Sequence, residues 1–294
     1  MITGIITFVL NEEHLPLWKL NGLKQLSGLF KSMTIWRNIS KEKQCNLEYM
    51  LNVLSMKNMN GDLCQLIIEG LDSELACMVL TEYISQKFNL VATTHLKKKN
   101  IISEIANAGM VLPETNFRLI FRTEPAAVLP KEILLYRALE SLNQQDGQRI
   151  ELFNALQVRE HISSTYLGDF IALPHIIHAA VPEPVLIIQR VGKPASWEKP
   201  EQQVALIITV LLPAKPERPL LQATTRFTRW LLNSFNRQVL TETTDDFTCE
   251  FIIRYVMAFY RRFSLYVLVN IFIPPDNHDF ASSRRCSFIL NQAK

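Results

Sequence analysis

Apolar and polar positions in the first 88 residues follow two spacings, one typical of strands and one typical of helices. Short apolar runs that predict strands occupy residues 2–10, 32–37 and 63–70. Apolar residues three and four positions apart, which predict amphipathic helices, occupy residues 20–30, 47–54 and 76–83. Strand and helix therefore alternate, and we expect one small α+β domain over residues 1–88.

A second block of the chain has longer and more continuous apolar runs. VLIIQRV (185–191) and VALIITVLL (204–212) are rich in β-branched residues and bounded by proline, as expected for central strands buried on both faces. Helical spacing precedes and follows them, so we expect a three-layer α/β arrangement in this block. Residues 89–110 contain Lys97–Lys99 and lack a strong sheet pattern, which predicts a linker.

The last part of the chain, residues 259–294, is expected to be a C-terminal extension. Its run SLYVLVNIFI (264–273) has half of the roughly 20 residues that a membrane helix needs, so we interpret it as a buried strand. The first residues lack the basic start and the small-residue cleavage site of a signal peptide. We therefore expect a cytoplasmic protein.

Composition and charge narrow the class of protein. With 48% hydrophobic residues and only 9 Gly and 14 Pro in 294 positions, a disordered or low-complexity chain is excluded. The net charge of +3 is too small to indicate a nucleic acid or an anionic membrane as partner. The basic, aromatic stretch RYVMAFYRRF (254–263) permits contact with nucleic acid or acidic lipid, but its basic residues flank an expected buried strand and we interpret them as a solvated face, so no nucleic-acid partner is expected.

The passage richest in side chains that can react or bind an anion is REHISSTYLGDFIALPH, from Arg159 to His175. It predicts an arginine at the end of a helix, then a Ser-Ser-Thr turn, a short strand, and a histidine on a backbone stiffened by proline. A neutral imidazole is a competent nucleophile, and Arg159, Ser164 and Thr165 offer donors for phosphoryl oxygens. A phosphoryl site at His175 is one interpretation. A histidine that merely packs in a turn is the other.

The same passage resembles the phosphorylation-site signature of enzyme IIA domains of the mannitol/fructose class, from the bacterial phosphoenolpyruvate-dependent sugar phosphotransferase system. The matching positions are Arg159, Glu160, Ser164, Thr165, Gly168, Ile171, Ala172, Pro174 and His175. The resemblance extends over about residues 111–258 and implies a three-layer α/β fold with a mixed sheet.

By that resemblance, this protein is a phosphotransferase component and His175 is its phosphoryl acceptor. HPr or enzyme I would be the donor and an enzyme IIB the acceptor of the next step, with Arg159, Ser164 and Thr165 holding the phosphate. Neither a cofactor nor a metal is implied, and a membrane is involved only indirectly, through the sugar permease.

Two positions depart from the enzyme IIA pattern. The family has glycine after the active histidine, where this chain has Ile176, and a second histidine where this chain has Pro219 or Leu220. His178 is a possible secondary site that would supply the missing imidazole. The departures leave open a second function, that of a non-catalytic regulatory or docking module for phosphotransferase-system proteins.

The first domain resembles the phosphocarrier HPr, mainly through GDLCQLIIEGLDSELACMVLTEYI (61–84), which implies an open-faced β-sandwich. The HPr signature is degenerate here, because EEHLPLW has no arginine between His14 and Pro16 and places Pro16 at the position of the nucleophile. His14 is a possible secondary phosphorylation site. The alternative is a degenerate domain kept for docking or stability.

Other chemistries lack their signatures. His175, His178 and Asp169 have no further ligands at a spacing convincing for a metal, so no metal site is expected. GxSxG, the P-loop and GxGxxG are absent from the sequence, which argues against a serine hydrolase and against direct use of a nucleotide.

Overall fold

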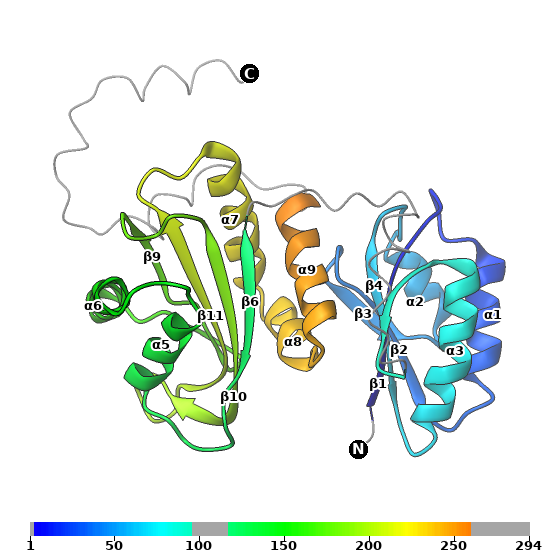
Figure 1. Cartoon of the computed structure of the whole chain (residues 1–294). Helices are drawn as coiled ribbons and strands as arrows, with labels where there is room; N and C mark the ends of the chain where they lie inside the picture. Colours follow the sequence, from blue (N-terminus) through cyan, green and yellow to red (C-terminus); the bar gives the residue numbers. More distant parts are fainter. Residues whose placement is uncertain (1–2, 96–116, 260–294) are drawn as a thin grey trace.

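The computed structural model describes residues 3–95 and 117–259, which form two sheets with helices on their faces (Figure 1). Within these two ranges, no helix has the length and apolar character required to span a membrane. The strand expected at 264–273 and most of the expected linker lie outside the described residues.

The first domain is an antiparallel sheet with helices on one face. Its strands lie in the order β3-β2-β4-β1-β5. They are β1 (Thr3–Val9), β2 (Met33–Asn38), β3 (Lys43–Asn46), β4 (Leu63–Glu69) and β5 (Asn89–Thr93). The helices are α1 (Leu17–Ser27), α2 (Met50–Ser55) and α3 (Ser73–Lys87). Alternate residues of β1 and β4 pack with all three helices in one apolar cluster, which confirms the predicted open-faced sandwich.

Two strands of this sheet were not predicted, and both are edge strands. β3 has the polar sequence KQCN, and β5 lies at residues 89–93, within the expected linker. An edge strand takes its ladder hydrogen bonds from one neighbour and needs little apolar alternation. The sequences of β3 and β5 therefore lack the pattern that predicts a strand. The first domain therefore extends beyond residue 88, and the predicted start of the linker was wrong.

The second domain has a mixed sheet between two layers of helices, as predicted. Its strands are β6 (Arg118–Thr123), β7 (Tyr166–Gly168), β8 (Ile171–Ala172), β9 (His175–His178), β10 (Val185–Ser196) and β11 (Gln203–Pro213). The order is β6-β10-β11-β8-β7, with β9 also paired to β11. β10 and β11 are antiparallel, whereas β6, β8 and β9 pair in parallel with their neighbours β10 or β11.

Helices cover both faces of this second sheet because its central strands are apolar on both sides. On one face lie α5 (Lys131–Glu140) and α6 (Asp146–Ile162). On the other lie α7 (Arg218–Leu231), α8 (Ser234–Glu242) and α9 (Asp246–Phe259). Along β10, Val185 and Ile187 pack with the first layer, while Leu186 and Ile188 pack with the second.

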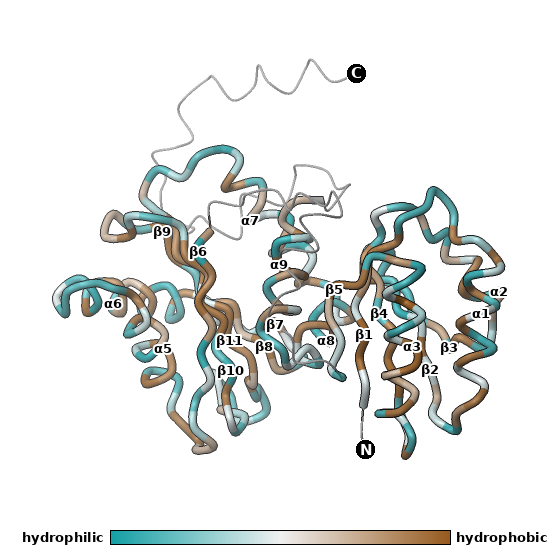
Figure 2. Tube along the Cα trace, turned by 45° about the vertical axis from the view of Figure 1, so that its right-hand side comes forward, coloured by the Kyte–Doolittle hydropathy of each residue, from teal (hydrophilic) through white to brown (hydrophobic). Residues whose placement is uncertain are grey.

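The two domains share one apolar cluster, because α8 and α9 lie against the sheet face of the first domain that α1–α3 leave uncovered (Figures 1 and 2). The first domain contributes Val9, Ile39, Leu63, Val91 and Ala92 to this cluster. Polar contacts cross the same boundary, including an ion pair between buried Arg37 and Glu242 with Nη1 and Oε2 2.7 Å apart. The open face of the sandwich is therefore closed by the second domain.

Tyr255 of α9 ties the two domains together through its hydroxyl. The hydroxyl oxygen lies 2.6 Å from the carbonyl oxygen of Gly61 and 2.9 Å from Ser40 Oγ. A carbonyl oxygen only accepts, so Tyr255 donates to Gly61 and Ser40 donates to Tyr255. Burial raises the pKa of Tyr255 to about 12.

Replacing Tyr255 by phenylalanine is expected to lower the free energy of unfolding by about 1–2 kcal/mol, since the bond to the Gly61 carbonyl and the bond from Ser40 are both lost at the domain boundary. Denaturant unfolding of the purified chain measures this change. The matched control is Tyr49→Phe, because the Tyr49 side chain is 62% exposed. Equal midpoints for wild type and Tyr255→Phe would show that this hydrogen bond adds nothing to the interface.

Candidate functional site

The ring of His175, at the first residue of β9, has a defined tautomer. Its side chain is buried, and Nδ1 lies 2.9 Å from the carbonyl oxygen of Leu173. Because that oxygen only accepts, Nδ1 carries the ring proton. Nε2 then bears the lone pair of the neutral ring, and it lies 3.1 Å from Nη2 of Arg159, which donates to it. The lone pair of the His175 ring is thus on Nε2 and faces a guanidinium group.

Arg159 lies in the last turn of α6 and is held at two points. Besides its contact with His175, its Nη1 donates to the carbonyl oxygen of Ser163 at 3.0 Å. A guanidinium presents five N–H donors in a rigid plane, so two contacts fix its orientation and leave further donors for an anion. The structure thus brings together Arg159 and His175, as the sequence predicted.

Glu160, the next residue of α6, is a buried carboxylate with four partners. It accepts from the backbone N–H of Thr165 (3.1 Å), the hydroxyl of Thr165 (2.6 Å) and the indole N–H of Trp197 (2.6 Å). Lys131 Nζ lies 3.9 Å from Oε1. Sequence reasoning did not identify this role, although a buried tryptophan, whose indole N–H can only donate, signals that an acceptor is near.

The two hydroxyls predicted to bind phosphate lie in the turn between α6 and β7. Thr165 directs its hydroxyl proton to Glu160, so that proton already has an acceptor. Ser164 Oγ accepts from the backbone N–H of Tyr166 at 3.4 Å and keeps its own proton for another acceptor. Of the two, Ser164 is the better placed to donate to an incoming anion.

His178 does not lie beside His175. The register pairs His175 with Val210, which packs in the α7–α9 layer, and pairs His178 with Pro213. Side chains three positions apart in a strand point to opposite faces, so His178 faces α6. There its Nδ1 accepts from the backbone N–H of Ala180 at 3.2 Å, and its Nε2 lies 3.7 Å from Glu151. The structure therefore offers His178 no contact that would replace the missing second histidine.

His14 is exposed in a bend just before α1. The helix that follows has Pro16 as its N-cap and no side-chain capping bond. Lys19, in the first turn, is buried, with its ammonium 2.5 Å from both Glu12 Oε1 and the carbonyl oxygen of Lys87. α1 and α6 lie at opposite ends of the molecule, so His14 and His175 are not brought together (Figure 1).

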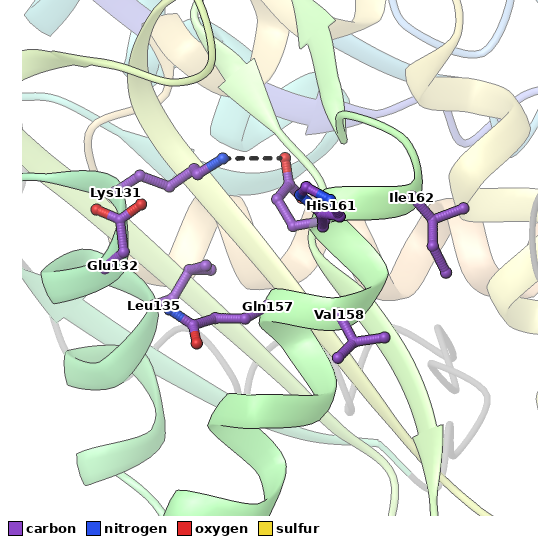
Figure 3. A pocket seen from close by; sticks show the side chains of 8 residues that line it. Lys131, Glu132, Leu135, Gln157, Val158, His161 and Ile162 are labelled. Atoms are coloured by element: carbon purple, nitrogen blue, oxygen red, sulfur yellow. Dashed lines mark ion pairs between the residues drawn. The ribbon is translucent and has the colours of Figure 1, made fainter.

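A surface cavity of about 470 Å³ lies between the start of α5 and the end of α6 (Figure 3). It is lined by Lys131, Glu132, Leu135, Gln157, Val158, Glu160, His161 and Ile162. The ion pair between Lys131 and Glu160 crosses it (Figure 3). Across residues 3–95 and 117–259, His, Cys, Asp and Glu side chains form no group of three or more that would hold a metal ion.

Comparison with known proteins gives a family match for the second domain. Residues 118–254 match the family described as phosphoenolpyruvate-dependent sugar phosphotransferase system, EIIA 2, which confirms the enzyme IIA resemblance. No curated protein matches the chain.

Solved structures resemble the chain at low identity. Nitrogen regulatory protein IIA-Ntr from Neisseria meningitidis is 22% identical, with a TM-score of 0.37, over 48% of this chain and 96% of that one. The histidine-containing phosphocarrier protein of a Mycoplasma is 20% identical, with a TM-score of 0.27, over 29% of this chain and 97% of that one. HPr-C-His from Thermoanaerobacter tengcongensis is 23% identical, with a TM-score of 0.26, over 30% of this chain and 94% of that one.

Proposed function

We propose that this chain, which carries an EIIA domain of the phosphoenolpyruvate-dependent sugar phosphotransferase system at residues 118–254, accepts a phosphoryl group on Nε2 of His175 and passes it on. The observation that carries the proposal is the pair of contacts on the His175 ring. Nδ1 is 2.9 Å from the Leu173 carbonyl oxygen, and Nε2 is 3.1 Å from a guanidinium nitrogen of Arg159. The ring is thereby prepared to attack through Nε2.

The transfer requires no proton movement at the attacking atom. The Nε2 lone pair forms the new N–P bond while the N–P bond of the donor phosphohistidine breaks, and its electron pair returns to the donor imidazole. The ring of His175 then carries a positive charge, because Nδ1 keeps its proton. The Leu173 carbonyl accepts from that N–H and stabilises the charged ring, and the phosphoryl dianion balances it.

Arg159 changes its partner during this step. Before transfer it donates to Nε2, and as phosphorus approaches Nε2 the same N–H groups turn to the phosphoryl oxygens. Its bond to the Ser163 carbonyl holds the guanidinium in place throughout. A preorganised cation at the developing negative charge is the group from which we expect the largest rate contribution. Ser164 donates from the neighbouring turn, and Thr165 acts through its backbone and through Glu160.

The enzyme IIA match at residues 118–254 supports partners from the same phosphotransferase system. HPr, itself loaded by enzyme I, is the donor, and an enzyme IIB of the fructose or mannitol class is the acceptor. The reaction takes place in the cytoplasm, and a membrane enters only through the sugar permease. Because the second domain closes the open sheet face of the first, His14 stays remote from His175, and the donor phosphohistidine comes from a separate molecule.

A second candidate function is a non-catalytic docking module that binds phosphotransferase-system proteins. It is favoured by the start of α7, where Pro219 and Leu220 stand in place of the family's second histidine. Under this alternative, partner proteins bind while His175 stays unmodified.

The two functions are separated by incubating the wild-type chain with phosphoenolpyruvate, enzyme I and HPr, and following intact mass and then transfer to an enzyme IIB. We expect one acid-labile phosphoryl adduct that disappears when enzyme IIB is added. A folded chain that binds HPr but gains no adduct would overturn the carrier function and favour the docking module.

A further inference from the structure

A closed circuit of contacts joins Glu160 to the reactive ring. The Thr165 backbone N–H donates to Glu160, and the Thr165 carbonyl accepts from the Leu173 N–H at 2.9 Å. The Leu173 carbonyl in turn accepts from Nδ1 of His175, whose Nε2 accepts from Arg159. Arg159 precedes Glu160 in the chain, so the circuit is completed by a peptide bond.

The geometry of α6 explains why the adjacent residues Arg159 and Glu160 contact different parts of the circuit. Consecutive residues of an α-helix point about 100° apart, so Arg159 reaches His175 while Glu160 points into the domain. There the Glu160 carboxylate takes donors from the turn after α6 and from Trp197, which follows β10. These bonds fix the rotation of the last turn of α6, and with it the direction in which Arg159 projects.

We propose that Glu160 is a positioning residue, whose carboxylate holds the Arg159 guanidinium at Nε2 of His175 and keeps the ring in its Nδ1–H tautomer. This inference rests on the proposed function for its consequence, because it concerns the speed of phosphoryl acceptance. Its structural content, the tautomer and the contact with Arg159, is independent of any transfer. A displacement of about 1 Å in a reacting or stabilising group is enough to cost about 100-fold in rate.

Glu160→Gln tests the proposal with little change in size. With its oxygen at the position of Oε1, the amide still accepts from the Thr165 N–H and the Trp197 indole, but as a neutral acceptor whose bonds are about half as strong. Its nitrogen at the position of Oε2 reverses the bond to the Thr165 hydroxyl, and the ion pair with Lys131 is lost, so the last turn of α6 is held less firmly. The variant keeps both Arg159 and His175, so any effect on the ring passes through their placement.

Glu124 provides a matched control in the same domain. Its carboxylate is also buried, and it accepts from Arg137 (2.7 Å) and Gln189 (2.8 Å). It follows β6, at the sheet edge opposite β7 and β8, and it belongs to no part of the circuit. Glu124→Gln therefore reports what the loss of a buried carboxylate does to the domain in general.

Two readouts are taken on the full chain. The first is the nitrogen-15 NMR spectrum of the unphosphorylated histidine rings, in which the two neutral tautomers give different shifts. The second is the initial rate of phosphoryl acceptance from phosphoenolpyruvate, enzyme I and HPr. For Glu160→Gln we expect a mixture of tautomers at His175 and a rate about 10-fold to 100-fold lower than wild type. Glu124→Gln is expected to keep the wild-type tautomer and rate.

An unchanged tautomer and rate in Glu160→Gln would overturn the proposal, as would equal changes in Glu124→Gln. If Glu160→Gln does not fold, Trp197→Phe replaces it, because it removes one donor and leaves the carboxylate. A smaller shift of tautomer and rate in the same direction is then expected, and none would contradict the proposal. A wild-type chain that gains no phosphoryl group refutes the proposed function, while the tautomer comparison still decides the role of Glu160.

Discussion

His175→Ala is expected to abolish phosphoryl acceptance altogether, since it removes the only atom in the proposed mechanism that forms the N–P bond. The measurement is intact mass after incubation with phosphoenolpyruvate, enzyme I and HPr, with circular dichroism to show that the variant is folded. His14→Ala and His178→Ala are matched controls, because His14 is remote from α6 and His178 faces the other side of β9. Both are expected to keep the adduct.

The outcome for these three variants also shows whether the first domain is phosphorylated. An adduct lost only in His175→Ala places the modified residue in the second domain. Loss of part of the adduct in His14→Ala would mean that the bend before α1 is phosphorylated as well. An adduct of full size in His175→Ala would show that the acceptor is another residue.

Arg159→Ala is the second change with a large expected effect, a fall of about 10²–10³-fold in the rate of phosphoryl acceptance. The guanidinium lies 3.1 Å from Nε2, and its loss removes charge stabilisation from the transferring group. Arg159→Lys is expected to recover only part of the rate, because a single ammonium cannot keep the planar set of contacts to Ser163 and His175.

The control for Arg159 is Arg149→Ala on the same helix. Arg149 pairs with Asp146 in the first turn of α6, so its removal changes the charge of the helix without touching the site. Initial rates of adduct formation compare the variants at equal donor concentration. A rate in Arg159→Ala within a factor of two of wild type would show that the guanidinium does not take part in the transfer.

The domain arrangement bears on how phosphoryl groups reach this chain. Glu42 Oε2 and Oε1 accept from Asn233 Nδ2 (2.6 Å) and Asn236 Nδ2 (2.7 Å), beside the apolar contacts that join the domains. These bonds hold α1 and α6 at opposite ends of the molecule (Figure 1). Direct transfer from His14 to His175 within one chain would require the interface to open, at the cost of exposing that apolar cluster.

Sequence alone was sufficient for the parts of the fold whose residues carry their own pattern. The runs that became β10 and β11 are apolar on both faces, and their burial follows directly from that composition. The pairing of Arg159 with His175 followed from a motif of fixed spacing. The edge strands β3 and β5 were not predicted, because each has its own sheet on one side only and solvent or the neighbouring domain on the other. Their sequences therefore lack the alternation of a strand packed within a sheet.

The rest of the site depends on contacts between distant segments. Nothing in the residues around Glu160 indicates that Trp197, 37 positions later, donates to it. His178 lies three residues from His175, yet the strand directs the two rings to opposite faces, which only the register reveals. Likewise, neither segment taken alone indicates that α8 and α9 cover the open face of the first sheet.

The central claim is that Nε2 of His175 receives the phosphoryl group while Nδ1 keeps its proton. The most direct test is nitrogen-15 and phosphorus-31 NMR of the phosphorylated chain labelled at its histidine rings. We expect a single phosphohistidine, coupled to phosphorus through Nε2 of His175, with the Nδ1 proton retained. Coupling through Nδ1, or a signal from any other histidine, would contradict the account.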